Sequence, residues 1–161
     1  MKNQYNFPTK LSKNDFEFSE VLKRGSIDIK ISSTIRSISI LNKKVINNDD
    51  IAISVTLPAE KHLEKLIEYI EWLGNLKEEF LDYYNNSIFE QKLTIADEKW
   101  YNNIEIDALL IEIQDDGIIQ CEIIFYDNRK NIFTFWKQDS YGFWLELEDK
   151  IIKSIKFDPI L

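Results

Sequence analysis

Cysteine and histidine are almost absent from this chain of 161 residues, which contains one of each. A single cysteine excludes a disulfide within the chain, and one Cys with one His cannot complete a Cys/His zinc site. Four glycines are present, and no phosphate-binding loop or dinucleotide-binding motif occurs. The serine-nucleophile and His-Glu-x-x-His motifs are missing too. The sequence therefore predicts a non-enzymatic protein with no cofactor, no metal site and no catalytic residue.

Long hydrophobic runs and an excess of basic charge are also missing. Lys, Glu or Asp interrupts every isoleucine-rich stretch, so no run approaches the roughly 18 apolar residues of a membrane span. The residues after Met1 are polar and lack the apolar region of a signal peptide. The 20 Lys and Arg against 28 Asp and Glu give a net charge of −8, which argues against a general nucleic-acid binder. We expect a cytoplasmic protein that binds neither membranes nor nucleic acid.

The composition is that of one folded domain over residues 1–161. Hydrophobic residues make up 44% of the chain and aromatic residues 13%, which is enough for a packed core. Between 26 and 57, β-branched residues alternate with polar ones, the period of half-buried strands. We predict a three-strand antiparallel meander over 26–57.

The hydrophobic period changes after Pro58. Apolar residues then recur at steps of three and four, which predicts one amphipathic helix from Ala59 to Tyr84. Gly74 lies inside this helix at a cost of about 1 kcal/mol, so we expect it to pack closely against another backbone.

Strands resume in the C-terminal part of the chain. We predict a short helix near 96–101 and then strands at 104–113, 118–126, 131–137, 143–147 and 151–157. Asp115-Asp116-Gly117 is a strong hairpin signal, and turns this short require antiparallel neighbours. The expected fold is α+β, with antiparallel meanders flanking one long helix that packs on a sheet face.

The acidic charge is unevenly distributed. Residues 1–57 carry +3, residues 58–86 carry −4 and residues 87–161 carry −7. In the predicted helix the acids follow one face at spacings of three, four and seven residues. They predict either a docking face for a basic partner or a solvated acidic face. These acids are Glu64, Glu68, Glu71, Glu78 and Asp82, preceded by Glu60.

A second candidate surface is aromatic. Strand alternation places Trp144 and Glu146 on the face opposite to Phe143, Leu145 and Leu147. Trp136 and Tyr141 are expected near Trp144 at one end of the sheet. Trp and Tyr rimmed by carboxylates resemble an interface hot spot, although burial under another element would explain the same pattern.

Other chemistry-bearing residues have simpler explanations. The pairs Glu105/Asp107 and Asp115/Asp116 could serve a hydrolase or hold a hard cation, but a polar strand face and a turn predict them equally well. His62 is expected to be solvated or partly packed on the helix. Cys121 is expected to be an inert buried thiol.

The general plan of the chain resembles that of small bacterial immunity proteins of contact-dependent inhibition and other polymorphic toxin systems. The resemblance depends on the acidic single domain and on two segments, Leu-Pro-Ala-Glu-Lys-His-Leu-Glu-Lys-Leu-Ile-Glu (57–68) and Tyr-Gly-Phe-Trp-Leu-Glu-Leu-Glu (141–148). Such proteins neutralise a cognate toxin by binding it, often with acidic surface against a basic cleft.

The resemblance implies that the partner is a basic toxin domain. The alternative function is an oligomeric structural or regulatory module, with the aromatic patch as the interface of a homodimer. A hydrolase would require two of the scattered carboxylates to converge in one cleft.

Overall fold

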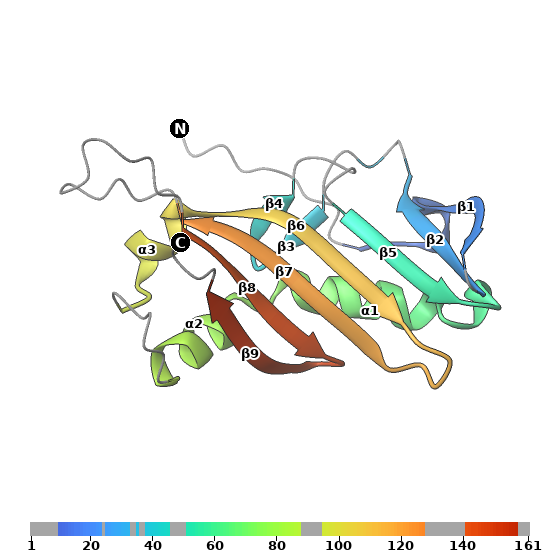
Figure 1. The fold of residues 1–161 in the computed structure, drawn as a ribbon. Coiled ribbons are helices and arrows are strands. Elements are labelled where there is room, and N and C mark those ends of the chain that lie inside the picture. Colours follow the sequence, from blue (N-terminus) through green and yellow to red (C-terminus); the bar gives the residue numbers. More distant parts are fainter. Residues whose placement is uncertain are drawn as a thin grey trace.

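The computed structural model describes residues 10–23, 25–32, 35, 38–45, 51–87, 95–127 and 141–157. It has an α+β fold in which most strand pairs are antiparallel. Seven strands form one twisted sheet in the order β1-β2-β5-β6-β7-β8-β9, and β3 and β4 form a separate two-stranded sheet (Figure 1). The strands are β1 (Phe16–Lys23), β2 (Ser26–Ile31), β3 (Ile38–Ile40), β4 (Lys43–Val45), β5 (Ile51–Thr56), β6 (Ile104–Ile113), β7 (Ile119–Asp127), β8 (Tyr141–Glu148) and β9 (Ile151–Phe157).

The predicted three-strand meander over 26–57 is not what the structure contains. β2 and β5 are direct antiparallel neighbours, with Asp28 opposite Ser54. The middle segment leaves the sheet, because Ile38–Ile40 pairs instead with Lys43–Val45. β1, which contains Phe16 and Phe18, supplies the third neighbour at the edge of the sheet.

One strand pair is parallel, and the sequence patterns did not predict it. β5 pairs with β6, with Ser54 opposite Glu112. Parallel neighbours need a long connection that crosses a sheet face, and here the connection contains the three α-helices found among the described residues. These are α1 (Leu63–Gly74), α2 (Lys77–Asn86) and α3 (Glu98–Asn103).

The long helix predicted for 59–84 is divided into two. A 3-10 turn at Ala59–Lys61 precedes α1, and α1 ends at Gly74. The carbonyl oxygens of Leu73 and Gly74 accept hydrogen bonds from the backbone N–H groups of Leu41 and Asn42, at 2.7 and 2.9 Å. These carbonyls would otherwise accept from residues 77 and 78 of a continuous helix, so the β3–β4 turn ends α1.

The close approach expected at Gly74 is present. A Cβ atom added there would lie 3.0 Å from the carbonyl oxygen of Ser39 in β3. Any side chain at this position would therefore push α1 away from the β3–β4 turn.

Both long helices lie on the same side of the seven-stranded sheet, behind the strands in Figure 1. α2 is anchored by aromatic stacking, in which the Phe80 ring lies 5.5 Å from the Phe125 ring, and Phe125 lies 4.7 Å from Phe143. All three rings are buried. α1 buries Leu63, Leu66, Ile70 and Leu73, and the Lys65 ammonium group lies 2.9 Å from the Asp149 carboxylate in the β8–β9 turn.

The C-terminal strands run antiparallel, as the short turns require. β6 and β9 have the predicted bounds, whereas β7 and β8 differ by one or two residues at their ends. The hairpin turn has Gly117 at φ +80°, and the Gly117 N–H donates to the Gln114 carbonyl at 2.9 Å. The strand predicted at 131–137 lies outside the described residues.

Candidate functional site

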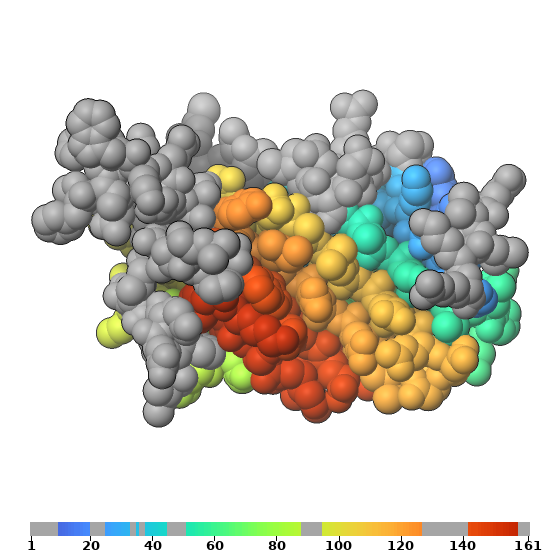
Figure 2. All heavy atoms as spheres, in the orientation of Figure 1, coloured from blue at the N-terminus to red at the C-terminus, as the bar shows by residue number. Residues whose placement is uncertain are grey.

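The sheet has one face that no described helix covers. We call this surface, opposite to α1 and α2, the open face. In the orientation of Figure 1 it points toward the viewer, and Figure 2 shows side chains from β5 to β9 at its surface. The open face is hollowed by a cavity of about 700 Å³ that extends from β2 to β9. The charged groups lining the cavity are five carboxylates and two lysines: Asp28, Glu112, Glu122, Glu146, Glu148, Lys30 and Lys153.

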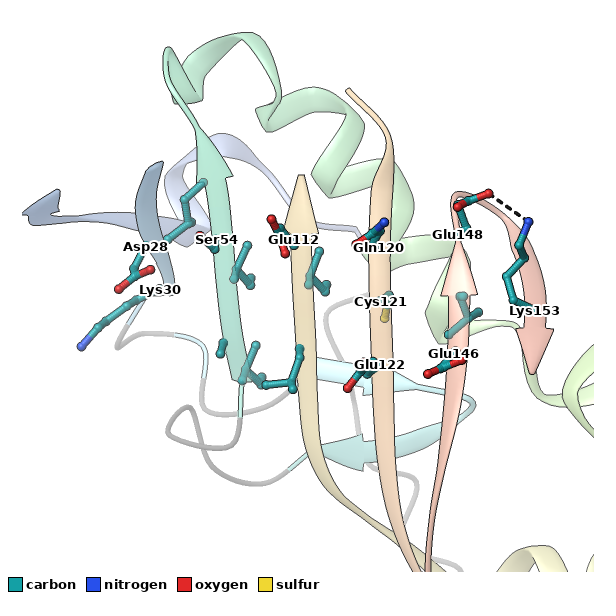
Figure 3. A pocket seen from close by; sticks show the side chains of 17 residues that line it. Asp28, Lys30, Ser54, Glu112, Gln120, Cys121, Glu122, Glu146, Glu148 and Lys153 are labelled. Carbon is teal, nitrogen blue, oxygen red and sulfur yellow. Dashed lines mark hydrogen bonds and ion pairs between the residues drawn. The ribbon is translucent and has the colours of Figure 1, made fainter. Parts of the chain in front are cut away.

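The strand register arranges these side chains in rows across the sheet. In the first row, Glu112 of β6 lies opposite Gln120 of β7, which lies opposite Glu148 of β8. In the second row, Glu122 lies between Leu110 of β6 and Glu146 of β8. Figure 3 shows the four glutamates projecting from three neighbouring strands into the same hollow. We call these two rows the acidic half of the open face.

Two of the four glutamates form ion pairs with lysines of β9. Lys153 lies 2.9 Å from Glu148. Lys156 forms an ion pair with Glu146, which also accepts a hydrogen bond from the Ser154 hydroxyl. Hydrogen bonds from Lys156, Ser154 and Trp144 hold the pKa of the Glu146 carboxyl below its usual value. Glu146 is thus fixed in its charged form.

The other two glutamates have no such partner. Within the part of the chain that the structure describes, the carboxylates of Glu112 and Glu122 make no hydrogen bond or ion pair, and both side chains are exposed. Glu122 also lies directly opposite Glu146, and like charges at opposed positions destabilise a sheet. The acidic half therefore has negative charge that a cation from outside the molecule could neutralise.

On the same three strands, the next row of the open face is apolar. In the third row, Ala108 of β6 lies opposite Ile124 of β7, which lies opposite Trp144 of β8. Tyr126 follows one row further, opposite Glu105 of β6, with 41% of its surface exposed. We call Ala108, Ile124, Trp144 and Tyr126 the apolar half. It is continuous with the acidic half, because both lie on β6, β7 and β8.

Trp144 and Glu146 occupy the face predicted for them. Phe143, Leu145 and Leu147 are buried against the helices, so the intervening residues of β8 point to the open face. Trp136 lies outside the described residues, as does the side chain of Tyr141. The predicted cluster of three aromatic residues therefore remains a prediction.

The helix acids lie on the other side of the molecule, and three of them already have partners. The Glu64 carboxylate lies 2.8 Å from the Lys13 ammonium group, whose hydrogen bond lowers the pKa of Glu64. A Glu71 oxygen accepts a hydrogen bond from the Leu11 backbone N–H at 2.8 Å. These two contacts hold the segment around Lys13–Asp15 against α1.

The remaining helix acids do not form one continuous surface. Glu68 is exposed on α1, whereas Glu78 and Asp82 are exposed on α2, beyond the turn that separates the helices. Glu78 lies 3.9 Å from the Lys77 ammonium group. The predicted acidic stripe is therefore divided, and it faces away from Trp144 and Glu146.

The groups most often used in catalysis are placed in structural positions. Cys121 is buried in β7, and burial raises the pKa of its thiol to about 12. His62 is buried at the start of α1. Glu105, Asp107, Asp115 and Asp116 are exposed, the last pair in the β6–β7 turn. No three His, Cys, Asp or Glu side chains among the described residues are gathered in a way that could hold a metal ion.

Comparisons with protein-family models, with curated proteins and with solved structures return no match to this chain. In the described ranges, none of the helices has the length and apolar character needed to cross a bilayer.

Sequence patterns missed three of the four glutamates that define the acidic half, namely Glu112, Glu122 and Glu148. Glu112 and Glu122 alternate with buried isoleucines and a cysteine, so each could be recognised as an outward-facing strand residue. Their proximity to Glu146 depends on the pairing of β6, β7 and β8, which the single-strand pattern does not specify.

Replacing Glu122 by Gln should stabilise the protein, because it removes one of two opposed negative charges. We expect a gain of about 0.3 kcal/mol in the free energy of unfolding, measured by urea denaturation at neutral pH. Glu112→Gln is the matched control, since Glu112 lies opposite the neutral Gln120. Equal effects of the two substitutions would contradict a specific Glu122–Glu146 repulsion.

Replacing Glu146 by Gln should destabilise the protein in a pH-dependent manner. Because folding lowers the pKa of Glu146, its charged form stabilises the fold above its ordinary pKa of 4.5, and this contribution is lost as the pH falls through the folded pKa. We expect a loss of about 1 kcal/mol at pH 7 that diminishes at pH values below 4.5. Denaturation curves of the two proteins at several pH values test this, and parallel pH profiles would contradict it.

Proposed function

We propose that this protein is a non-enzymatic binding protein that engages a basic protein partner through the open face of its sheet. In this proposal it acts in the bacterial cytoplasm as an immunity protein and neutralises a toxin by covering its basic cleft. The observation that carries the proposal is the position of Glu112 and Glu122, two exposed carboxylates without cationic partners among the described residues. They lie in a hollow that no described helix covers.

Charge complementarity supports a basic partner. The cavity is lined by five carboxylates and two lysines, and one of the lysines is already paired with Glu148. The chain after residue 57 carries −11, so the local field adds to that of the whole molecule. Such a field steers a basic partner toward the protein and increases the rate of association.

The open face suits this role better than the helix acids do. Glu64 and Glu71 already bind Lys13 and the Leu11 backbone, so using them would require those contacts to break. In contrast, the acidic half is held on three paired strands and needs no rearrangement. A rigid surface loses little conformational entropy on binding.

The resemblance to immunity proteins agrees with this mode of action. Neutralising a toxin by occlusion requires surface complementarity and no chemical step. The absence of a recognisable catalytic motif in the sequence is compatible with that requirement, although it does not identify the partner.

Reversing the charge of the acidic half should weaken binding to the toxin. The variant is Glu112→Lys/Glu122→Lys, and the partner to test is the product of the adjacent upstream gene. We expect association to slow by about tenfold at low salt and to lose most of its salt dependence, measured by surface plasmon resonance. The same variant should also protect poorly against growth inhibition by the toxin.

The matched control is Glu68→Lys/Asp82→Lys, which changes the net charge by the same amount on the opposite side of the molecule. Circular dichroism verifies that both variants are folded. Equal loss of binding in the two variants would assign the effect to net charge. Unchanged binding by the open-face variant would exclude the acidic half from the interface.

A homodimeric module is the second candidate function, and the exposed apolar side chains favour it. Leu110 and Tyr126 expose 39% and 41% of their surface on the open face. Two copies joined through the apolar half and the adjoining Leu110 would cover these groups. This candidate predicts a dimer in static light scattering at micromolar concentration and a monomer after Tyr126→Lys. A wild-type monomer would exclude it.

A further inference from the structure

The two halves of the open face lie on the same three strands at a fixed separation. Along β7, Ile124 of the apolar half lies two residues from Glu122 and four residues from Gln120, whose row also contains Glu112. At about 3.3 Å per residue, the apolar row is roughly 7 Å from the row of Glu122 and roughly 13 Å from the row of Glu112. A partner segment that contacts both halves must therefore present cations and apolar side chains at about those distances.

The shape of the open face decides which kind of segment can lie on it. β6, β7 and β8 are consecutive neighbours, and strands spaced by about 4.8 Å make this strip about 10 Å wide. An α-helix with its side chains has a diameter of about 10–12 Å. A helix running along β7 would thus contact the outward-facing side chains of all three strands (Figure 3).

An extended segment is a poorer occupant of this surface. β7 is hydrogen-bonded on both sides, by β6 and by β8, so a strand lying on the open face would find no backbone partners. Its N–H and C=O groups would be removed from water without new hydrogen bonds, which is unfavourable. A helix satisfies its backbone internally and presents only side chains.

We propose that the open face binds a basic amphipathic helix of the partner, lying along β7. Its Lys or Arg side chains contact Glu112 and Glu122, and its apolar side chains pack on Ile124 and Trp144. At 1.5 Å per residue, the cations that contact Glu122 and Glu112 lie about four and about nine residues of the helix from its apolar side chains. This inference rests on the proposed function, because it specifies which part of the basic partner occupies the same surface.

The local charges indicate which carboxylates the cations of the helix would reach. Glu146 and Glu148 are already paired with Lys156 and Lys153, whereas Glu112 and Glu122 are not. Beside the apolar half, Glu105 lies opposite Tyr126, and Lys156 lies opposite Trp144.

A synthetic helix tests this inference without the natural partner. The probe is an acetylated and amidated peptide of about 20 residues on an alanine-rich background, with three arginines and two leucines on one face. The nearest arginine is about four residues from the leucines, and the farthest is about nine residues from them. It is titrated into the 15N-labelled full-length protein. We expect amide shift changes in β6, β7 and β8, with both Glu122 and Ile124 among the affected residues.

Three controls make the outcome decisive. A peptide of the same composition with its arginines and leucines interleaved should bind about tenfold more weakly. Glu112→Lys/Glu122→Lys and Trp144→Ser should each weaken binding of the probe by at least about tenfold. Glu68→Lys/Asp82→Lys should leave it unchanged.

The inference is overturned if the protein does not bind the probe or if it binds the interleaved peptide equally well. Shift changes that fall on α1 and α2 would also overturn it. Failure of the proposed function is a separate result. A probe that binds, combined with an upstream gene product that does not, would reject the immunity role alone. A toxin that binds through Glu112 and Glu122, combined with a probe that fails, would reject the helix alone.

Discussion

The packing of α1 and α2 on one face of a seven-stranded sheet determines the remainder of this structure. Burial of the inner face supplies the core, in which Phe80 stacks on Phe125 and Phe125 stacks on Phe143. The same strands must then present their other face to solvent wherever no further element covers it. The surface proposed for binding is thus a direct consequence of how the core is built.

The connection between β5 and β6 is where this arrangement is established. It carries the three α-helices, and it joins two parallel strands, so the helices must cross a sheet face. Backbone N–H groups of the β3–β4 turn donate hydrogen bonds to the carbonyls of Leu73 and Gly74 at the end of α1. That contact divides the helix and directs α2 toward β9, where the Tyr83 hydroxyl donates to the Lys153 carbonyl at 2.9 Å.

The carboxylates of this acidic protein have different roles that depend on their contacts. Glu64 and Asp149 bind Lys13 and Lys65 and so connect α1 to neighbouring segments. Glu146 binds Lys156 within the sheet. Glu112 and Glu122 make no comparable contact among the described residues, although they lie in the same hollow as Glu146. Negative charge without a hydrogen-bond or ion-pair partner among the described residues is the physical basis of the proposed interface.

The sequence by itself determined the period-two strands, including the bounds of β6 and β9, and the direction of Trp144 and Glu146 away from Phe143. These features follow from local backbone geometry, which a short stretch of residues specifies. Only the tertiary structure decided that α1 ends at Gly74, because its last carbonyls are used by a turn some thirty residues earlier in the chain. The tertiary structure alone also decided that Glu112, Glu122 and Glu146 share one surface, while the helix acids lie on the opposite side of the sheet. Strand order and register bring these residues together, and both depend on contacts between distant segments that no local pattern records.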